Sequence, residues 1–141
     1  MRLNKIIDSD LYRYTGGEKI SLISKKRLYG WEYTRIWRKT NSSVGTKFKY
    51  LVYGYILYRK SLKYGFQISP YATIGRGLYL GHFGLIVVGN EVIIGDNCNL
   101  SPNVVIGRTN RGTKKGSPKI GNSVWIGSGA VVVGKITIGD N

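Results

Sequence analysis

The chain has one histidine, and its sequence context suits a catalytic role. His82 lies in the segment GHFG, next to Gly81 and Phe83. Imidazole is the side chain that ionises closest to neutral pH, so its neutral form can accept a proton from an attacking hydroxyl group. The alternative is an exposed turn histidine without a role. One histidine cannot supply a three-histidine zinc site, so we expect no metal.

A second group of residues suited to chemistry is the basic stretch RTNRGTKKGSPK, residues 108–119. Guanidinium and ammonium groups at this density can bind phosphates or an acidic sugar. The alternative is that they are ordinary solvated charges of a loop.

Both groups interrupt a six-residue repeat that organises the second half of the chain. Glycine usually follows each aliphatic residue of the repeat, and a small or aliphatic residue stands four positions after it. A period of six predicts a prism of short parallel strands, three to a coil and about four coils in all. Breaks in such a repeat are common places for function. The repeating aliphatic residues are Ile68, Ile74, Leu80, Val88, Ile94, Leu100, Ile106, Ile120, Ile126, Val132 and Ile138.

The repeat, the glycine-histidine bulge and one long loop before a PKIG turn resemble the hexapeptide-repeat acyltransferases of the serine acetyltransferase type. The similarity is closest to the short members found in capsule and lipopolysaccharide clusters. It is carried by YGFQISPYATIGRGLYLGHFGLIVVG, NEVIIGDNCNLSPNVVIG and SPKIGNSVWIGSGAVVVGKITIGDN. This resemblance implies a mainly β fold, a left-handed parallel β-helix after a short helical N-terminal region, although parallel crossovers are ordinarily right-handed.

The resemblance also implies an acetyl-CoA-dependent O-acetyltransferase that works as a homotrimer, with His82 as the general base and active sites between subunits. Backbone N–H groups of Gly84 or Gly107 would bind the oxyanion of the intermediate. We expect acetyl-CoA to contact Gly107, Arg108, Lys119 and Ser128, and a small-molecule acceptor to contact Gly81, Phe83, Arg111 and Ser117.

Two places depart from serine acetyltransferases. The family has an aspartate where Gly81 stands, and an arginine and histidine where Gly116 and Ser117 stand. The missing residues favour a sugar hydroxyl in surface-polysaccharide synthesis as the acceptor. The alternatives are serine O-acetylation for cysteine synthesis and a non-catalytic scaffold at a membrane. Because the repeat ends inside a hexad at Asn141, we expect a chain truncated at its C-terminus, whose activity depends on the missing coil.

Residues 1–66 differ in composition from the hexads of residues 67–141. They hold fifteen Lys and Arg against four acidic residues, which places +11 of the net +15 there, with nine of the eleven tyrosines. We expect three helices: one through Asp10 to Tyr14 capped by Ser9 or Asp10, one from about Ser24 to Thr40, and one from about Val44 to Leu62. The third has an apolar face of Phe48, Leu51, Val52, Tyr55, Ile56 and Leu62.

These helices are expected to cover the open end of the prism, where strand edges would otherwise be unpaired. An alternative places Trp31, Trp37 and the basic residues on the inner face of the membrane. The longest apolar run, residues 50–58, is too short to span a bilayer. With no signal sequence, no nucleic-acid module and one inward cysteine, Cys98, we expect a cytoplasmic protein with peripheral membrane contact at most and no nucleic-acid partner.

Overall fold

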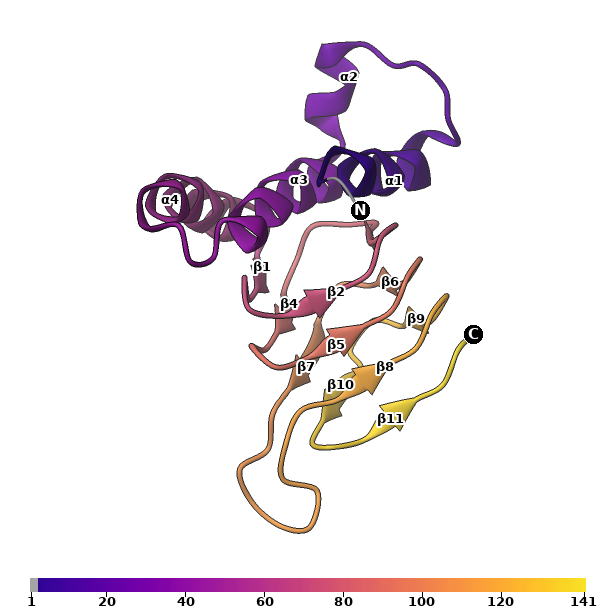
Figure 1. Cartoon of the computed structure of the whole chain (residues 1–141). Coiled ribbons are helices and arrows are strands. Elements are labelled where there is room, and N and C mark those ends of the chain that lie inside the picture. The colour runs from indigo at the N-terminus through magenta and orange to yellow at the C-terminus, as the bar shows by residue number, and fades with distance from the viewer. Residues whose placement is uncertain (1–2) are drawn as a thin grey trace.

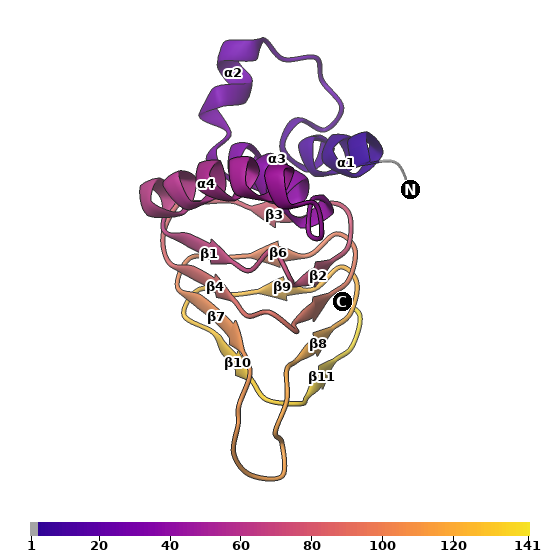
Figure 2. The same cartoon turned by 60° about the vertical axis from the view of Figure 1, so that its left-hand side comes forward.

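The computed structural model describes residues 3–141, which form a β-helix with a layer of helices across one end (Figures 1 and 2). The helices are α1 (Leu3–Thr15), α2 (Leu22–Arg27), α3 (Tyr29–Ser42) and α4 (Lys47–Tyr64). The strands are β1 (Phe66–Ile68), β2 (Thr73–Ile74), β3 (Tyr79–Leu80), β4 (Ile86–Val88), β5 (Ile93–Ile94), β6 (Asn99–Leu100), β7 (Val104–Gly107), β8 (Lys119–Ile120), β9 (Trp125–Ile126), β10 (Val131–Val133) and β11 (Thr137–Ile138).

The strands form three parallel sheets, and each sheet is one side of the prism. Side A contains β1, β4, β7 and β10; side B contains β2, β5, β8 and β11; side C contains β3, β6 and β9. The repeating aliphatic residue of one coil pairs with the repeating aliphatic residue of the next coil, as in the ladder from Ile68 to Val88 to Ile106. The predicted prism of about four coils is therefore confirmed.

The repeating aliphatic residues fill the prism as predicted. Ile94 is 1% exposed and Ile126 6%, while Ala130 is partly buried and packs against the same core. Cys98 is fully buried, and burial raises the pKa of its thiol. Its side chain is a small core group, as expected from its inward position.

Glycine is required at one corner of the prism because successive coils approach closely there. A Cβ added to Gly95 would lie 2.6 Å from the Gly121 carbonyl and from the Asn122 side chain. At this corner the side chain of one coil accepts a hydrogen bond from the backbone of the previous coil, as from Asp96 N to Asn122 Oδ1 at 2.8 Å. Gly127 occupies the same hexad position at another corner, where an added Cβ would meet nothing within 4 Å.

The helical layer differs from the expected helix boundaries. Helix α1 begins before Ser9 and Asp10, so neither residue caps it, and Asp10 is buried instead. The helix expected from Ser24 to Thr40 is divided at Leu28, whose backbone is not helical, and the shorter α2 is capped by Ser21. Helix α4 ends at Tyr64, followed by Gly65 in the left-handed conformation.

Helices α1 and α3 cover the open end of the prism, as expected, and their side chains hydrogen-bond its first coil. The buried Arg38 donates to the Ile74 carbonyl at 2.6 Å and pairs with Asp10 at 2.9 Å. Asp10 in turn accepts from Leu78 N at 3.0 Å. Backbone groups that would be unpaired at this edge are thereby satisfied.

Helix α4 does not present its predicted apolar face to the prism. Leu57 and Tyr64 are its buried residues, whereas Phe48, Leu51 and Leu62 are 62–78% exposed. Trp31 and Trp37 are buried, so the alternative that placed these two tryptophans on a membrane is wrong.

Candidate active site

His82 lines a cavity of about 270 Å³ beside side C of the prism. The segment that carries it joins β3 on side C to β4 on side A, where two extra residues widen the turn. The outward residues of side C, Tyr79, Asn99 and Trp125, stack in successive coils and form one wall. The lining residues are Tyr79, Gly81, His82, Asn99, Leu100, Ser101, Pro102, Trp125 and Ser128.

Apart from His82, the residues that line the cavity are aromatic, apolar or uncharged polar residues. Trp125 is 72% exposed, and its indole N–H donates to Ser101 Oγ at 2.9 Å. The Tyr79 ring packs on Tyr14 with centroids 4.6 Å apart. Of the lining residues, none is Asp, Glu, Lys or Arg. Arg13 lies next to this wall, but it donates to Asn99 Oδ1 at 2.6 Å and to backbone carbonyls.

Among residues 3–141, none hydrogen-bonds the imidazole of His82. A general base needs an accessible lone pair, and His82, which is exposed, has one. Gly81 provides no side chain that could orient the ring. No hydrogen bond within residues 3–141 therefore fixes the orientation of the imidazole.

The cavity brings together three of the predicted site residues, Gly81, His82 and Ser128. Phe83 is adjacent to His82 in sequence but does not line the cavity. Its ring meets Tyr29 of α3 edge-on, with centroids 6.1 Å apart, so it packs toward the helical layer. The predicted contact between Phe83 and the acceptor is thus not supported by its position.

Arg108 and Ser117 lie together at a different corner of the prism, between sides A and B. Arg108 donates to both carboxylate oxygens of Glu91 at 2.9 Å, and Ser117 Oγ lies 3.4 Å from the same carboxylate. Gly107, at the end of β7, begins the loop, and Arg111 is exposed within it. Lys119 projects from β8 on side B. Within one chain, none of these five residues lines the His82 cavity.

One of the two predicted oxyanion donors is occupied. The N–H of Gly84 donates to the Tyr64 carbonyl at 2.9 Å, which ties the bulge to the end of α4. Gly84 is therefore not available as a donor. Gly107 lies at the other corner, away from His82 in the same chain.

Sequence reasoning missed Tyr79, Asn99, Ser101 and Trp125. The first two and Trp125 each precede an inward aliphatic residue, so their outward direction follows from the period of two within a strand. Their common side follows from the hexad count. The alternation within each strand and the hexad count, taken together, therefore predict that Tyr79, Asn99 and Trp125 form one outward row on side C.

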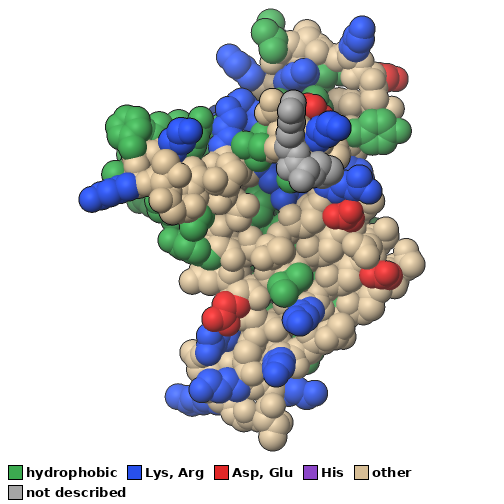
Figure 3. Space-filling view, viewed as in Figure 1, with side chains coloured by type: hydrophobic (Ala, Val, Ile, Leu, Met, Phe, Trp, Pro, Cys, Tyr) green, Lys and Arg blue, Asp and Glu red, His purple; other side chains and the backbone are tan. Residues whose placement is uncertain are grey.

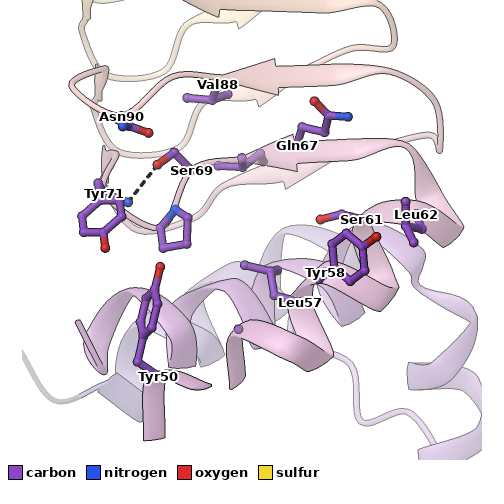
Figure 4. A pocket seen from close by; sticks show the side chains of 13 residues that line it. Tyr50, Leu57, Tyr58, Ser61, Leu62, Gln67, Ser69, Tyr71, Val88 and Asn90 are labelled. Carbon is purple, nitrogen blue, oxygen red and sulfur yellow. Dashed lines mark hydrogen bonds between the residues drawn. The ribbon is translucent and has the colours of Figure 1, made fainter. Parts of the chain in front are cut away.

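A second groove, of about 580 Å³, lies between α4 and the first coils of side A (Figure 4). Tyr50 of α4 and Tyr71 of the first coil face one another across it, with ring centroids 6.3 Å apart. Gln67 and Asn90 line its other wall. It contains neither His82 nor any other predicted site residue, so we place the candidate active site in the smaller cavity.

No family model matches the chain. Over 77 residues, 55% of its length, it is 40% identical to a serine acetyltransferase of Helicobacter pylori and 38% identical to one of Synechococcus elongatus. The matched segments cover 45% and 32% of those proteins. The chain is similar to serine acetyltransferases.

The similarity in three dimensions includes the N-terminal helices. The Neisseria gonorrhoeae serine acetyltransferase matches with a TM-score of 0.78 and 25% identity, over 99% of this chain and 55% of that one. Serine acetyltransferase isoform 3 from Entamoeba histolytica, solved with cysteine, matches with a TM-score of 0.74 and 27% identity, over 99% and 50%. The prism is accordingly a left-handed β-helix, as predicted. The chain spans about half the length of these proteins or less.

Proposed function

We propose that the protein transfers an acetyl group from acetyl-CoA to a hydroxyl group, with His82 as the general base. The observation that carries this proposal is an accessible histidine in a cavity of a β-helix similar to serine acetyltransferases. The imidazole takes the hydroxyl proton while the oxygen bonds to the thioester carbonyl carbon. The tetrahedral intermediate then expels the sulfur of coenzyme A, which leaves as the thiol after taking up the proton.

The surface next to the cavity suits the acetyl donor. An extended pantetheine arm needs a surface groove in which it can lie close to the backbone. Glycines with no side chain and no other atoms in front of them provide such a groove. Added Cβ atoms on Gly127 and Gly129, at the corner between sides C and A, would meet nothing within 4 Å. Ser128, between these two glycines, lines the His82 cavity. The donor would thus reach His82 along the corner that contains Ser128.

L-serine is the acceptor that the relatives' names support. A free amino acid carries an ammonium and a carboxylate, which need partners of opposite charge when they leave water. In the described part of the chain the cavity offers neither. Another subunit would have to supply them.

A sugar hydroxyl is the second candidate, and the lining of the cavity favours it. Sugars are neutral, and their rings have apolar faces that pack on aromatic side chains such as Trp125 and Tyr79. Asn99 and Ser101 add polar groups beside them. Gly81, where serine acetyltransferases have an aspartate, fits the same uncharged acceptor.

The site also requires a second subunit, and a homotrimer with parallel prisms supplies one. The loop from residue 108 to 116 leaves the corner between sides A and B, while His82 leaves the corner between sides C and A. A threefold axis along the prism turns a neighbour by 120°, which can bring its loop to this histidine. The outward valines of side A, Val87, Val105 and Val131, form an apolar column suited to such an interface.

The experiment that tests this function is release of the coenzyme A thiol from acetyl-CoA by the full chain, measured with L-serine and with a set of neutral hexoses and amino sugars. Release that depends on one acceptor class supports acetyl transfer and identifies the acceptor. Acetyl-CoA that remains intact with every acceptor, and no binding of acetyl-CoA by calorimetry, would favour the scaffold alternative.

A further inference from the structure

Helix α4 carries an apolar stripe that faces solvent. Its members recur every three or four residues, the spacing of one face of a helix. They are 43–78% exposed, so the arrangement is the reverse of an ordinary surface helix, which buries its apolar face. We call this set the α4 stripe, and it consists of Phe48, Leu51, Val52, Tyr55, Tyr58 and Leu62.

The opposite face of α4 is held firmly against the molecule, so the stripe cannot simply rotate inward. Leu57 and Tyr64 are each 5% exposed. Lys60 Nζ lies 2.7 Å from Glu32 of α3, and the Tyr64 hydroxyl hydrogen-bonds the same carboxylate. Turning the stripe toward the core would expose the two buried residues and break both contacts.

Basic residues flank the stripe. At about 100° per residue, Lys47 falls on one side of the stripe and Lys63 on the other, while Arg59 falls within it, between Tyr55 and Val52. The residues of 1–66 together carry a net charge of +11. Figure 3 shows Lys and Arg side chains over the helical layer, with hydrophobic side chains gathered at α4.

Two occupants could cover such a stripe, and the charge distinguishes them. A second α4 would bring another strongly basic region against the first, and like charges repel. An anionic lipid surface attracts the same residues, by about 1 kcal/mol for each Lys or Arg near it. Apolar residues between flanking basic ones are typical of helices that lie in the plane of a membrane interface.

We propose that the α4 stripe inserts into the interfacial region of an anionic lipid membrane. No helix among residues 3–141 is long and apolar enough to cross a bilayer, so α4 lies along the surface. Figures 1 and 2 show α4 at the end of the β-helix opposite the basic loop, which leaves the lower coils away from the lipid. Leu22 and Ile23 of α2, also exposed in this layer, lie close in sequence to Lys25 and Lys26.

The test is sedimentation of the full chain with vesicles. We expect binding to an equal mixture of phosphatidylglycerol and phosphatidylcholine, weak binding to phosphatidylcholine alone, and release by high salt because screening weakens attraction between exposed charges. Inorganic phosphate at the same charge concentration should not compete, since it offers no apolar phase. Failure of the unaltered chain to bind anionic vesicles would overturn the proposal.

Two variants and a matched control locate the contact. Leu51→Ser with Leu62→Ser should weaken vesicle binding about tenfold or more, because two exposed leucines no longer transfer to lipid. Lys47→Gln with Lys63→Gln should weaken it about fivefold for each lysine. Ile93→Ser removes an exposed aliphatic residue from side B of the β-helix, outside the proposed subunit interface, and should change nothing.

All these side chains are exposed or flank an exposed face, so circular dichroism should show an unchanged fold. Equal loss of binding in Ile93→Ser would contradict the proposal. A second contradicting result has two parts: the unaltered chain binds no vesicles, and the leucine variant has a different molar mass in solution by light scattering. The α4 stripe would then be covered by a second copy of the chain.

Discussion

His82 lines a cavity whose other walls are uncharged, and this combination limits what can bind beside it. A general base needs only a hydroxyl within reach, but the acceptor's remaining groups must match Trp125, Tyr79, Asn99 and Ser101. Charged acceptors would lose hydration here without gaining a charged partner from the described residues that line the cavity. The aromatic wall therefore determines which acceptors can bind more than the general base does.

Replacing Trp125 tests the role of this wall. Trp125→Ala should raise the KM for the acceptor about tenfold, since stacking on an aromatic face contributes on the order of 1 kcal/mol beyond the area buried. Trp125→Phe should keep most of the affinity, and Ser101→Ala controls for the lost hydrogen bond. If the KM for acetyl-CoA rises instead while that for the acceptor stays constant, Trp125 contacts the donor.

At this scale, residues within one break of the repeat were predictable and pairs across coils were not. The two-residue bulge singled out His82 and its neighbour Gly81, whereas the position of Ser128 in the same cavity depends on the stacking of coils. Arg108 and Ser117 meet Glu91 instead, a residue 17 and 26 positions away in sequence. That contact depends on the stacking of β5 on β8 and on the path of the loop, which local sequence does not determine.

Successive coils of the prism approach one another most closely at the corner between sides B and C. Gly95→Ala should destabilise the chain by about 1–3 kcal/mol, because its Cβ would overlap backbone atoms of the next coil. Gly127→Ala, at the same hexad position, should change stability by less than about 0.5 kcal/mol. Chemical denaturation measures both. Equal effects would show that the two corners do not differ as described.

The contact between α3 and α4 should depend on pH. Burial acts to raise the pKa of Glu32, but hydrogen bonds from Lys60 and Tyr64 outweigh it and hold the pKa below its ordinary value of 4.5. A carboxyl with a lowered pKa stabilises the fold above its unfolded value and loses that contribution as the pH falls through the folded value.

We therefore expect the melting temperature of the unaltered chain to fall more steeply between about pH 5 and about pH 3 than that of Glu32→Gln. If the melting temperatures of the two proteins fall in parallel across that range, the fold does not stabilise the ionised form of Glu32.

Strand positions could be predicted from the repeat because one period determines all three sides. The helices could not be predicted as well, since their boundaries depend on tertiary contacts. Asp10 reads as a helix cap, yet it is buried against Arg38 because the first coil needs a hydrogen-bond acceptor for Leu78 N. Five of the six residues predicted for the apolar face of α4 point outward, because Leu57, Tyr64 and the contact with Glu32 hold the opposite side of the helix against the molecule; the sixth, Ile56, packs against the core.

Across the whole molecule, the predicted site residues divide between two corners of the prism. Gly81, His82 and Ser128 lie at one, whereas Arg108 and Ser117 lie at another. A threefold arrangement of parallel prisms is the simplest way to join them. It would also cover the outward valines of side A.

Mixing two inactive chains tests that assembly. A chain with His82→Ala and a chain that lacks residues 108–116 should each be inactive. Mixed trimers should regain part of the activity, because one interface then combines an intact histidine with an intact loop. A monomer by light scattering at assay concentration, or no recovery on mixing under conditions where subunits exchange, would contradict a shared site.

The role of His82 in acetyl transfer is tested most directly by the rate of acetyl-CoA turnover in the full chain and in His82→Ala. We predict that kcat falls about a hundredfold or more, with little change in the affinity for acetyl-CoA, because the variant lacks the proton acceptor and keeps the donor groove. A His82→Ala chain that turns over acetyl-CoA as fast as the unaltered protein would contradict the proposed mechanism.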